Sequence, residues 1–331
     1  MPRRFIADLG HQENIDQIFL ASQKQLRPNR NGNLYLQVDL ADRSGSINAR
    51  MWNAQEADYR SFEDGDLVHV EGATQIYQGG LQLIATSICK ARPEEVDLAD
   101  FMCLTPGDID RLALRLAEML RSMQDLPLRN LAECFLTDDQ FMQRLAKSPA
   151  GIKNHHAYPG GLLEHVVNLM EVADSVAGHY PILNRDLLLM GVFLHDIGKV
   201  EELSSDHGFA YTDAGQLLGH IILAISMLDA KLVQAEELAG EPLPEETVLR
   251  LKHMIVSHHG EYEFGAPKLP MTLEAIALHQ LDNLDAKLHN FQQLMRDDAN
   301  LDSPWTQYHQ NLGRKLFKGR AEATERVGGQ Q

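Results

Sequence analysis

Histidine and aspartate side chains that could bind divalent cations are concentrated in one part of the chain. Twelve of the fifteen histidines lie between residues 155 and 289 of the 331-residue sequence. His165 follows Leu162 by three positions and precedes Leu169 by four, so it points toward the buried side of an amphipathic helix. Comparable positions, on apolar helix rows or at the ends of apolar stretches, are held by His195, Asp196, His220, His258, His259 and Asp282.

Burying several imidazoles and carboxylates from separate helices is costly unless they find partners. Shared divalent cations would remove this cost. Neutral imidazole and carboxylate suit manganese, iron, zinc or cobalt, whereas calcium and magnesium prefer all-oxygen ligands. Two such ions can share a hydroxide, aim it at phosphorus and stabilise the leaving oxygen. We therefore expect two divalent metal ions, Mn²⁺ first and iron, zinc or cobalt as alternatives, no organic cofactor, and hydrolysis of a phosphate ester.

Not every histidine in this stretch belongs to the expected site. A single histidine on an apolar helix face is more often a hydrogen-bonded core or surface residue than a ligand, and only the joint pattern reverses that expectation. Nothing beyond residue type favours His179, His207, His253, His279 and His289. We expect these five to be ordinary core or surface residues.

The first part of the chain has the pattern of a small β-barrel. Apolar residues alternate in Leu34, Leu36, Val38 and Leu40, which is typical of a strand with one buried face. A polar, helix-compatible segment at residues 53–62 separates the third strand from the fourth. Five strands with one helix in that place are the plan of an OB-fold, which often binds single-stranded nucleic acid. The strands are predicted at residues 15–26, 33–40, 46–52, 66–77 and 81–90.

After the barrel the hydrophobic period changes to 3.6, and a run of amphipathic helices continues to about residue 317. The fold class is therefore multi-domain, with an N-terminal all-β OB-fold barrel followed by an all-α domain. The predicted divisions are residues 1–92 for the barrel, 93–107 for a linker, 108–317 for the helical domain and 318–331 for a frayed tail.

The net charge of −17 argues against a protein that coats polyanions. However, residues 1–92 hold 10 Lys and Arg against 11 Asp and Glu, so the barrel can present a basic face through Arg27, Arg30, Arg43 and Arg50. Three cysteines without a CxxC pair indicate a reducing compartment. No signal peptide or uninterrupted membrane-length apolar run is present, so we expect a cytoplasmic protein without a membrane partner. The apolar helix faces are compatible with a homo-oligomer, but they can equally build the core of a monomer, so the sequence does not decide the oligomeric state.

The ordered set of candidate ligands resembles that of the HD-domain phosphohydrolases in their two-metal version, over roughly residues 110–315. The segment Leu-His-Asp-Ile-Gly-Lys at 194–199 strengthens this likeness. The resemblance implies that Asp196 bridges the two metals. It assigns one metal to His165, His195, Asp196 and Asp282, and the second to His220, His258 and His259.

The resemblance also implies roles around the metals. Lys199 is similar to a lysine that contacts a substrate phosphate. Asp285 could orient a ligand imidazole, and Glu164 could do the same or face solvent. His155 or His156 could protonate the leaving oxygen or hold a phosphate, with loop capping as the alternative.

HD domains act on nucleoside triphosphates, cyclic nucleotides, cyclic dinucleotides and RNA. An OB-like barrel followed by this HD domain resembles the YhaM family of bacterial 3′-to-5′ exoribonucleases over nearly the whole chain, with shared features at residues 155–165, 219–221 and 257–260. The likeness implies a barrel that grips single-stranded RNA, or single-stranded DNA, while its 3′ end enters the metal site. The candidate nucleic-acid contacts are Tyr35, Trp52, Tyr77 and Arg50, although each aromatic also suits a barrel core.

Two other functions compete with this hypothesis. HD-GYP cyclic-dinucleotide phosphodiesterases share the ligand order, but their Gly-Tyr-Pro signature corresponds here to Gly265-Ala266-Pro267. A non-catalytic nucleic-acid-binding protein with structural metals is the other alternative. The full ligand set and Lys199 argue against it, because structural metal sites are usually closed.

Overall fold

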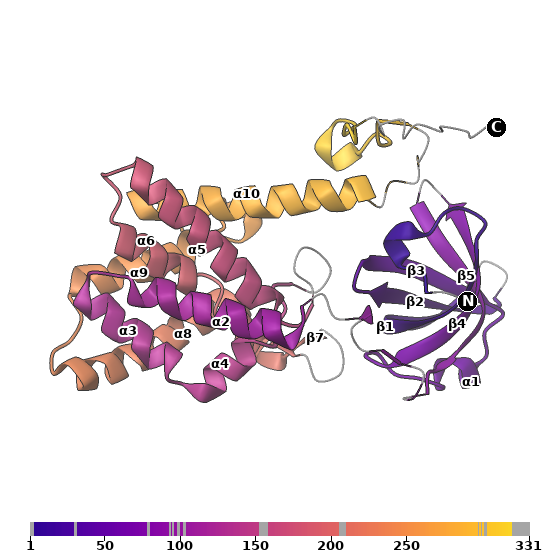
Figure 1. Cartoon of the computed structure of the whole chain (residues 1–331), viewed down its shortest axis with the longest axis horizontal. Helices are drawn as coiled ribbons and strands as arrows, with labels where there is room; N and C mark the ends of the chain where they lie inside the picture. The colour runs from indigo at the N-terminus through magenta and orange to yellow at the C-terminus, as the bar shows by residue number, and fades with distance from the viewer. Residues whose placement is uncertain are drawn as a thin grey trace, which may run out of the picture. The chain divides into compact units, whose positions relative to one another are not determined.

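The computed structural model describes residues 3–319, except 30–31, 78–79, 93, 95, 98–99, 102–103, 152–157, 205–209, 297, 299 and 301–302. The chain forms two compact units (Figure 1). One contains residues 1–101 and 289–331, and the other contains residues 102–288. Each unit is taken by itself below.

The first unit holds a closed five-stranded barrel with strand order β1-β2-β3-β5-β4. The long strand β1 closes it, because its second half pairs with β2 and its first half with β4. Inward-facing positions carry Phe19, Leu36, Val38, Val70 and Leu83, all buried. A short helix lies between β3 and β4, so the predicted OB-fold is confirmed. The elements are β1 (Asn14–Pro28), β2 (Leu34–Asp42), β3 (Gly45–Trp52), α1 (Glu56–Tyr59), β4 (Leu67–Tyr77) and β5 (Gly80–Lys90), preceded by the 3₁₀ turn η1 (Ile6–Asp8).

The C-terminal segment belongs to the barrel unit, so the predicted helical domain ending at residue 317 extends too far. The last long helix stops at Arg296, and a backbone bridge joins Asp298 to Gly80 at the start of β5. The Asp298 carboxylate accepts hydrogen bonds from the backbone N–H of Gln307 and from Lys318 Nζ, which fold the chain back on itself. In place of the expected helix, the chain after Arg296 therefore forms a compact segment held together by hydrogen bonds to the buried Asp298 carboxylate.

The second unit is helical, as predicted. Its core includes an edge-to-face cluster of Phe135, Phe141 and Phe193. The first helix begins at Pro106, inside the predicted linker, because Thr105 and Asp108 form a reciprocal capping box around it. The elements are α2 (Pro106–Arg121), α3 (Leu126–Leu136), α4 (Asp139–Leu145), α5 (Gly161–His179), α6 (Arg185–Leu194), α7 (Lys199–Glu202), β6 (Leu203–Ser204), β7 (Ala210–Tyr211), α8 (Asp213–Ala239), α9 (Glu245–Ser257), η4 (Tyr262–Phe264) and α10 (Leu273–Arg296); η5 (Gln310–Leu312) lies in the other unit.

By length and composition alone, α8 is the one helix in the described part of the chain that could cross a membrane. It is interrupted at Gly219 and packs against α3, α7 and α9. Its inward side carries the buried Lys231, which donates to Asp138 Oδ2 at 2.8 Å. These contacts are those of a helix within a folded domain.

Candidate metal centre and nucleic-acid surface

Two groups of candidate ligands meet inside the helical unit. The first comes from α5, the end of α6 and α10, and the second from α8 and the end of α9. In each group, one ligand atom per residue lies within 4.8 Å of the others, which is close enough to hold a metal ion. The groups are His165, His195 and Asp282, and His220, His258 and His259.

Asp196 lies between the two groups and presents one carboxylate oxygen to each. Its Oδ2 is 3.3 Å from His195 Nε2 and 3.9 Å from His165 Nε2. Its Oδ1 is 3.5 Å from His220 Nε2 and 3.7 Å from His258 Nε2. A carboxylate placed in this way can serve both groups at once.

Two of the histidines are fixed by the ends of their own helices. His195 follows α6 and His258 follows α9, each as the C-cap residue. Each Nδ1 lies 2.7 Å from the carbonyl three residues earlier, Val192 O and Ile255 O respectively. A carbonyl only accepts, so Nδ1 carries the proton and Nε2 keeps its lone pair for the site.

Carboxylates orient two further imidazoles. Asp285 Oδ2 lies 3.0 Å from His165 Nδ1. The sequence predicted that Asp285 could orient a ligand imidazole without identifying which one. Glu202 Oε1 lies 3.2 Å from His220 Nδ1 and also accepts from the His220 backbone N–H at 3.0 Å. Both acids therefore turn Nε2 of their histidine toward Asp196.

Sequence reasoning missed Glu202, and it set His279 aside. His279 is buried and donates from Nδ1 to His258 O at 2.8 Å, so it supports the histidine pair from behind. The one signal in the sequence that favours His279 is its spacing on α10, four residues after the apolar Ala275 and three before the candidate ligand Asp282. By contrast, His253 accepts from the Met271 N–H at 2.8 Å and anchors a loop.

Two glycines allow this arrangement. A Cβ on Gly198 would lie 1.9 Å from the His220 carbonyl oxygen and 2.7 Å from Ala224 N, so α7 can approach α8 only without a side chain there. Gly219 has a φ of 73°, in the left-handed region that favours glycine, and this kink releases the His220 N–H to Glu202. The backbone itself thus sets the distance from Asp196 to His220.

Burial and charge keep two of the imidazoles neutral. Burial together with neighbouring His195 holds the pKa of His258 well below its ordinary value. Burial and neighbouring His220 likewise lower the pKa of His259. Burial also opposes a charge on His165, but its hydrogen bonds with Asp282 and Asp285 prevail and raise its pKa to about 9.

The two inner carboxylates stay ionised. Burial disfavours their charge, but Lys199 and His195 hold the pKa of Asp196 well below its ordinary range. His165 and His195 do the same for the pKa of Asp282 despite its burial. The centre therefore combines ionised carboxylates with imidazoles, of which His258 and His259 are held neutral and His165 must lose a proton before it can bind a metal. Carboxylate and neutral imidazole are ligands that first-row divalent metals take.

The centre also has buried polar atoms that a cation would satisfy. Among the described residues, none makes a hydrogen bond to Asp196 Oδ1, His220 Nε2 or His259 Nδ1, and all three atoms are buried. Buried polar atoms without partners are rare in folded proteins. These residues fit divalent cations, and the donor set is that of a metal centre.

The remaining candidates occupy different positions. Lys199 points into the centre and donates to Asp196 Oδ2 at 2.6 Å. The proximity of Asp196 raises the pKa of Lys199 despite its burial. Glu164 accepts from the Tyr158 hydroxyl. His155 and His156 lie outside the described residues.

The candidate nucleic-acid residues lie on the outer face of the barrel, not in its core. Tyr35 and Trp52 are cross-strand partners on β2 and β3, with ring centroids 5.2 Å apart. Trp52 is 43% exposed and Tyr77 is 49% exposed. The Arg50 guanidinium lies over the Tyr77 ring at 5.6 Å. Arg27 is exposed and lies opposite Tyr35 in the pairing of β1 with β2, so it adds positive charge to this face.

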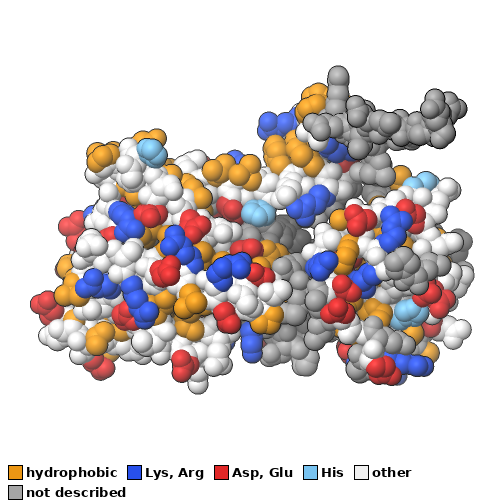
Figure 2. Space-filling model, viewed as in Figure 1, with side chains coloured by type: hydrophobic (Ala, Val, Ile, Leu, Met, Phe, Trp, Pro, Cys, Tyr) orange, Lys and Arg blue, Asp and Glu red, His pale blue; other side chains and the backbone are white. Residues whose placement is uncertain are grey.

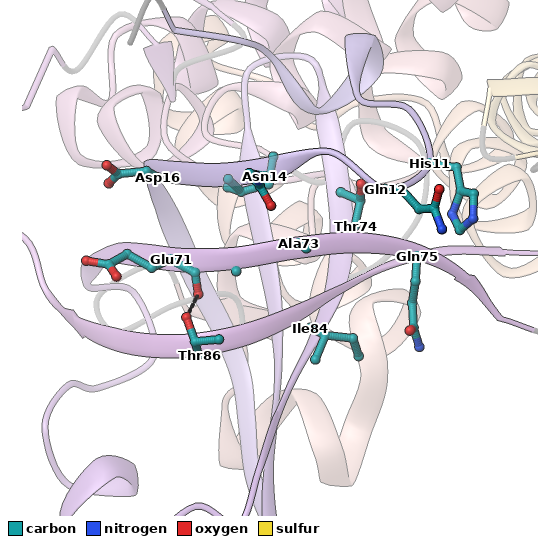
Figure 3. Close-up of a pocket in the computed structure, with 12 residues that line it drawn as sticks. His11, Gln12, Asn14, Asp16, Glu71, Ala73, Thr74, Gln75, Ile84 and Thr86 are labelled. Atoms are coloured by element: carbon teal, nitrogen blue, oxygen red, sulfur yellow. Dashed lines mark hydrogen bonds between the residues drawn. The ribbon is translucent and has the colours of Figure 1, made fainter.

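A pocket of about 840 Å³ lies elsewhere on the barrel, along β1, β4 and β5 (Figure 3). Asp16 and Glu71 line the same end of it, and with His69 they form an exposed group that could also hold an ion. His69 Nε2 already lies 2.6 Å from Asp16 Oδ1. Two carboxylates disfavour a polyanion there, which leaves the face of β2 and β3 as the better surface for nucleic acid.

Comparisons with known proteins agree with this architecture. The OB-fold nucleic acid binding domain family matches residues 21–90, and the HD domain family matches residues 162–287. The 3′-5′ exoribonuclease YhaM of Bacillus velezensis is 37% identical over 277 residues, which cover 83% of this chain and 86% of that protein. The chain belongs to the YhaM family.

Other YhaM proteins show the same relation. YhaM of Bacillus subtilis is 36% identical over 84% of this chain and 86% of its own length. YhaM of Listeria innocua is 36% identical over 80% of this chain and 83% of its own. The resemblance to YhaM enzymes seen in the sequence is thereby confirmed, and the protein is a hydrolase that acts on phosphodiester bonds of nucleic acid.

Proposed function

We propose that the protein removes nucleotides from the 3′ end of single-stranded RNA at a centre of two divalent cations, and releases nucleoside monophosphates. One observation carries the proposal: the two oxygens of Asp196 face two separate ligand groups, each built from helices of the same domain. The relatives named 3′-5′ exoribonuclease support the substrate and the direction.

Two cations would be held as the sequence resemblance implies. His165, His195 and Asp282 would hold one, His220, His258 and His259 the other, and Asp196 would bridge them. Mn²⁺ is the first candidate, because mixed imidazole and carboxylate ligands suit it better than Ca²⁺ or Mg²⁺. When bound, the cations would supply Lewis acidity and neutralise the charge that develops on the scissile phosphate.

The chain's own residues prepare the site for this reaction. Glu202 and Asp285 fix the rings of His220 and His165, so little reorganisation is needed when substrate arrives. Lys199 remains cationic beside Asp196 and supplies positive charge where a phosphate oxygen would lie. We assign protonation of the leaving oxygen to His155 or His156.

The barrel would hold the strand. Tyr35 and Trp52 offer aromatic surfaces on which bases stack, at about 1 to 3 kcal/mol per base and without sequence preference. Arg27 and Arg50 would meet the phosphates. RNA affinity would therefore depend on the barrel, and turnover on the metal centre.

The test is a substrate panel. Purified protein is incubated with end-labelled single-stranded RNA, single-stranded DNA, cyclic di-GMP and deoxynucleoside triphosphates, with and without Mn²⁺. We expect Mn²⁺-dependent release of monophosphates from RNA whose 3′ end is free. Hydrolysis of the cyclic dinucleotide alone would overturn the proposal, and RNA binding without hydrolysis would leave only a binding protein.

A further inference from the structure

The C-terminal segment of the barrel unit has an unusual composition. Residues 303–319 contain three Lys and Arg residues and no Asp or Glu, in a chain whose net charge is −17. Three large aromatic side chains in this segment are exposed: Trp305 at 48%, Tyr308 at 59% and Phe317 at 50%. Figure 2 shows hydrophobic and basic side chains side by side on the C-terminal segment, in the same view as Figure 1.

The segment is a folded hairpin. Backbone bridges pair Trp305 with Phe317 and His309 with Arg314. The Trp305 and Phe317 ring centroids are 4.9 Å apart, and Thr306 and Leu316 are buried. Its aromatic groups are therefore displayed on an ordered backbone, and they stay exposed although the segment has a small core of its own.

The hairpin is attached beside the candidate RNA surface of the barrel. Asp298, which organises the hairpin through Lys318 and the Gln307 N–H, bridges to Gly80 at the start of β5. Gly80 is also the partner of Tyr77 in the pairing of β4 with β5. Gly80 therefore pairs with Tyr77 of the candidate RNA surface and also forms the bridge that anchors the hairpin. The Arg50 guanidinium lies over the Tyr77 ring.

Lys318 is neutralised by Asp298, but the exposed rings lie in one segment with exposed Arg314 and Lys315, and residues 303–319 contain no Asp or Glu. This composition matches the chemistry of a single-stranded nucleic acid. Bases stack on aromatic faces, and phosphates pair with Arg and Lys. We propose that residues 303–319 are a second binding element for single-stranded RNA, continuous with the barrel surface. The strand would stack on Tyr308 while Arg314 and Lys315 meet its phosphates; this rests on the proposed function.

Binding is measured by fluorescence anisotropy with a labelled oligouridine, in a full-length Asp196→Ala background that does not consume the RNA. Tyr308→Ala should weaken binding about fivefold or more, as loss of one stacked base predicts. Arg314→Ala combined with Lys315→Ala should weaken it too. That double variant should also reduce the slope of log affinity against log salt by about 1.4, because two phosphate contacts are lost.

Matched variants separate RNA contact from damage to the fold. Tyr308→Phe keeps the ring and should bind like the parent. Tyr180→Ala and Arg111→Ala remove an exposed ring and an exposed charge from the helical unit and should leave affinity unchanged. Unchanged thermal unfolding of Tyr308→Ala confirms an intact fold.

The outcomes are distinct. Parental affinity and parental salt dependence in both hairpin variants would overturn the inference, and lost binding to anionic lipid vesicles in those same variants would assign the surface to a membrane. Failure of the proposed function is detected separately in the substrate panel, because the unmodified protein would then leave RNA intact whatever the hairpin binds.

Discussion

The metal centre and the proposed RNA surface of the barrel meet opposite structural requirements. In the centre, His165, His195 and His258 are buried, and each ring is fixed at Nδ1 by a defined acceptor. On the barrel, by contrast, Trp52 and Tyr77 are about half exposed. Chemistry needs ligands in one geometry, whereas holding an arbitrary sequence needs adaptable surfaces. Single changes should therefore act sharply in the first region and gradually in the second.

The sharpest contrast is expected for Asp196→Ala. It removes the carboxylate that faces both ligand groups, so turnover should fall by about a thousandfold or more, because metal assistance supplies several kcal/mol. RNA affinity should change little, since in the proposed function the barrel holds the strand. Single-turnover hydrolysis and RNA binding are measured on the same preparation. Lost binding with retained turnover would reverse the assignment of the two regions.

Changing a residue that only orients a ligand should cost less. Glu202→Gln weakens the hold on His220, and about 10- to 100-fold in metal affinity or activity is the usual loss. Glu201→Gln is the matched control, because Glu201 is the adjacent residue and its carboxylate pairs with Arg144 and not with His220. Mn²⁺ titration of the rate distinguishes the two. Equal effects would show that Glu202 has no part in placing the imidazole.

Metal affinity should depend on pH through His165. Its pKa is raised to about 9, so the cation-free protein carries a proton there at neutral pH, and that proton must leave before Nε2 can bind a metal. Apparent Mn²⁺ affinity should rise by up to about tenfold per pH unit below that value and level off above it. Calorimetry in buffers of different ionisation enthalpy counts the released protons. Affinity that is flat between neutral and alkaline pH would contradict this.

The smallest effect on turnover is expected on the barrel. Trp52→Ala removes one stacking surface, worth about 1 to 3 kcal/mol, and should raise the KM for RNA without changing kcat. Trp52→Phe should restore most of the affinity. A fall in kcat at constant KM would instead place Trp52 in the reaction.

Features that depend on residues close together in the sequence could be predicted, whereas features that depend on contacts between distant residues could not. The barrel and the seven candidate ligands were visible because alternation in β2 and the helical rows around His165 and His220 are local patterns. Glu202 was not visible, because its role depends on a contact with His220, which lies 18 residues later and directly after the kink at Gly219. The hairpin at 303–319 was missed because paired bridges of one residue each leave no periodic pattern.

The close approach at Gly198 links the two halves of the metal centre mechanically. Because α7 touches the backbone of α8 there, the span between the ligand groups is set by main chain and not by adjustable side chains. Retuning the centre to an ion of another size would require moving a whole helix.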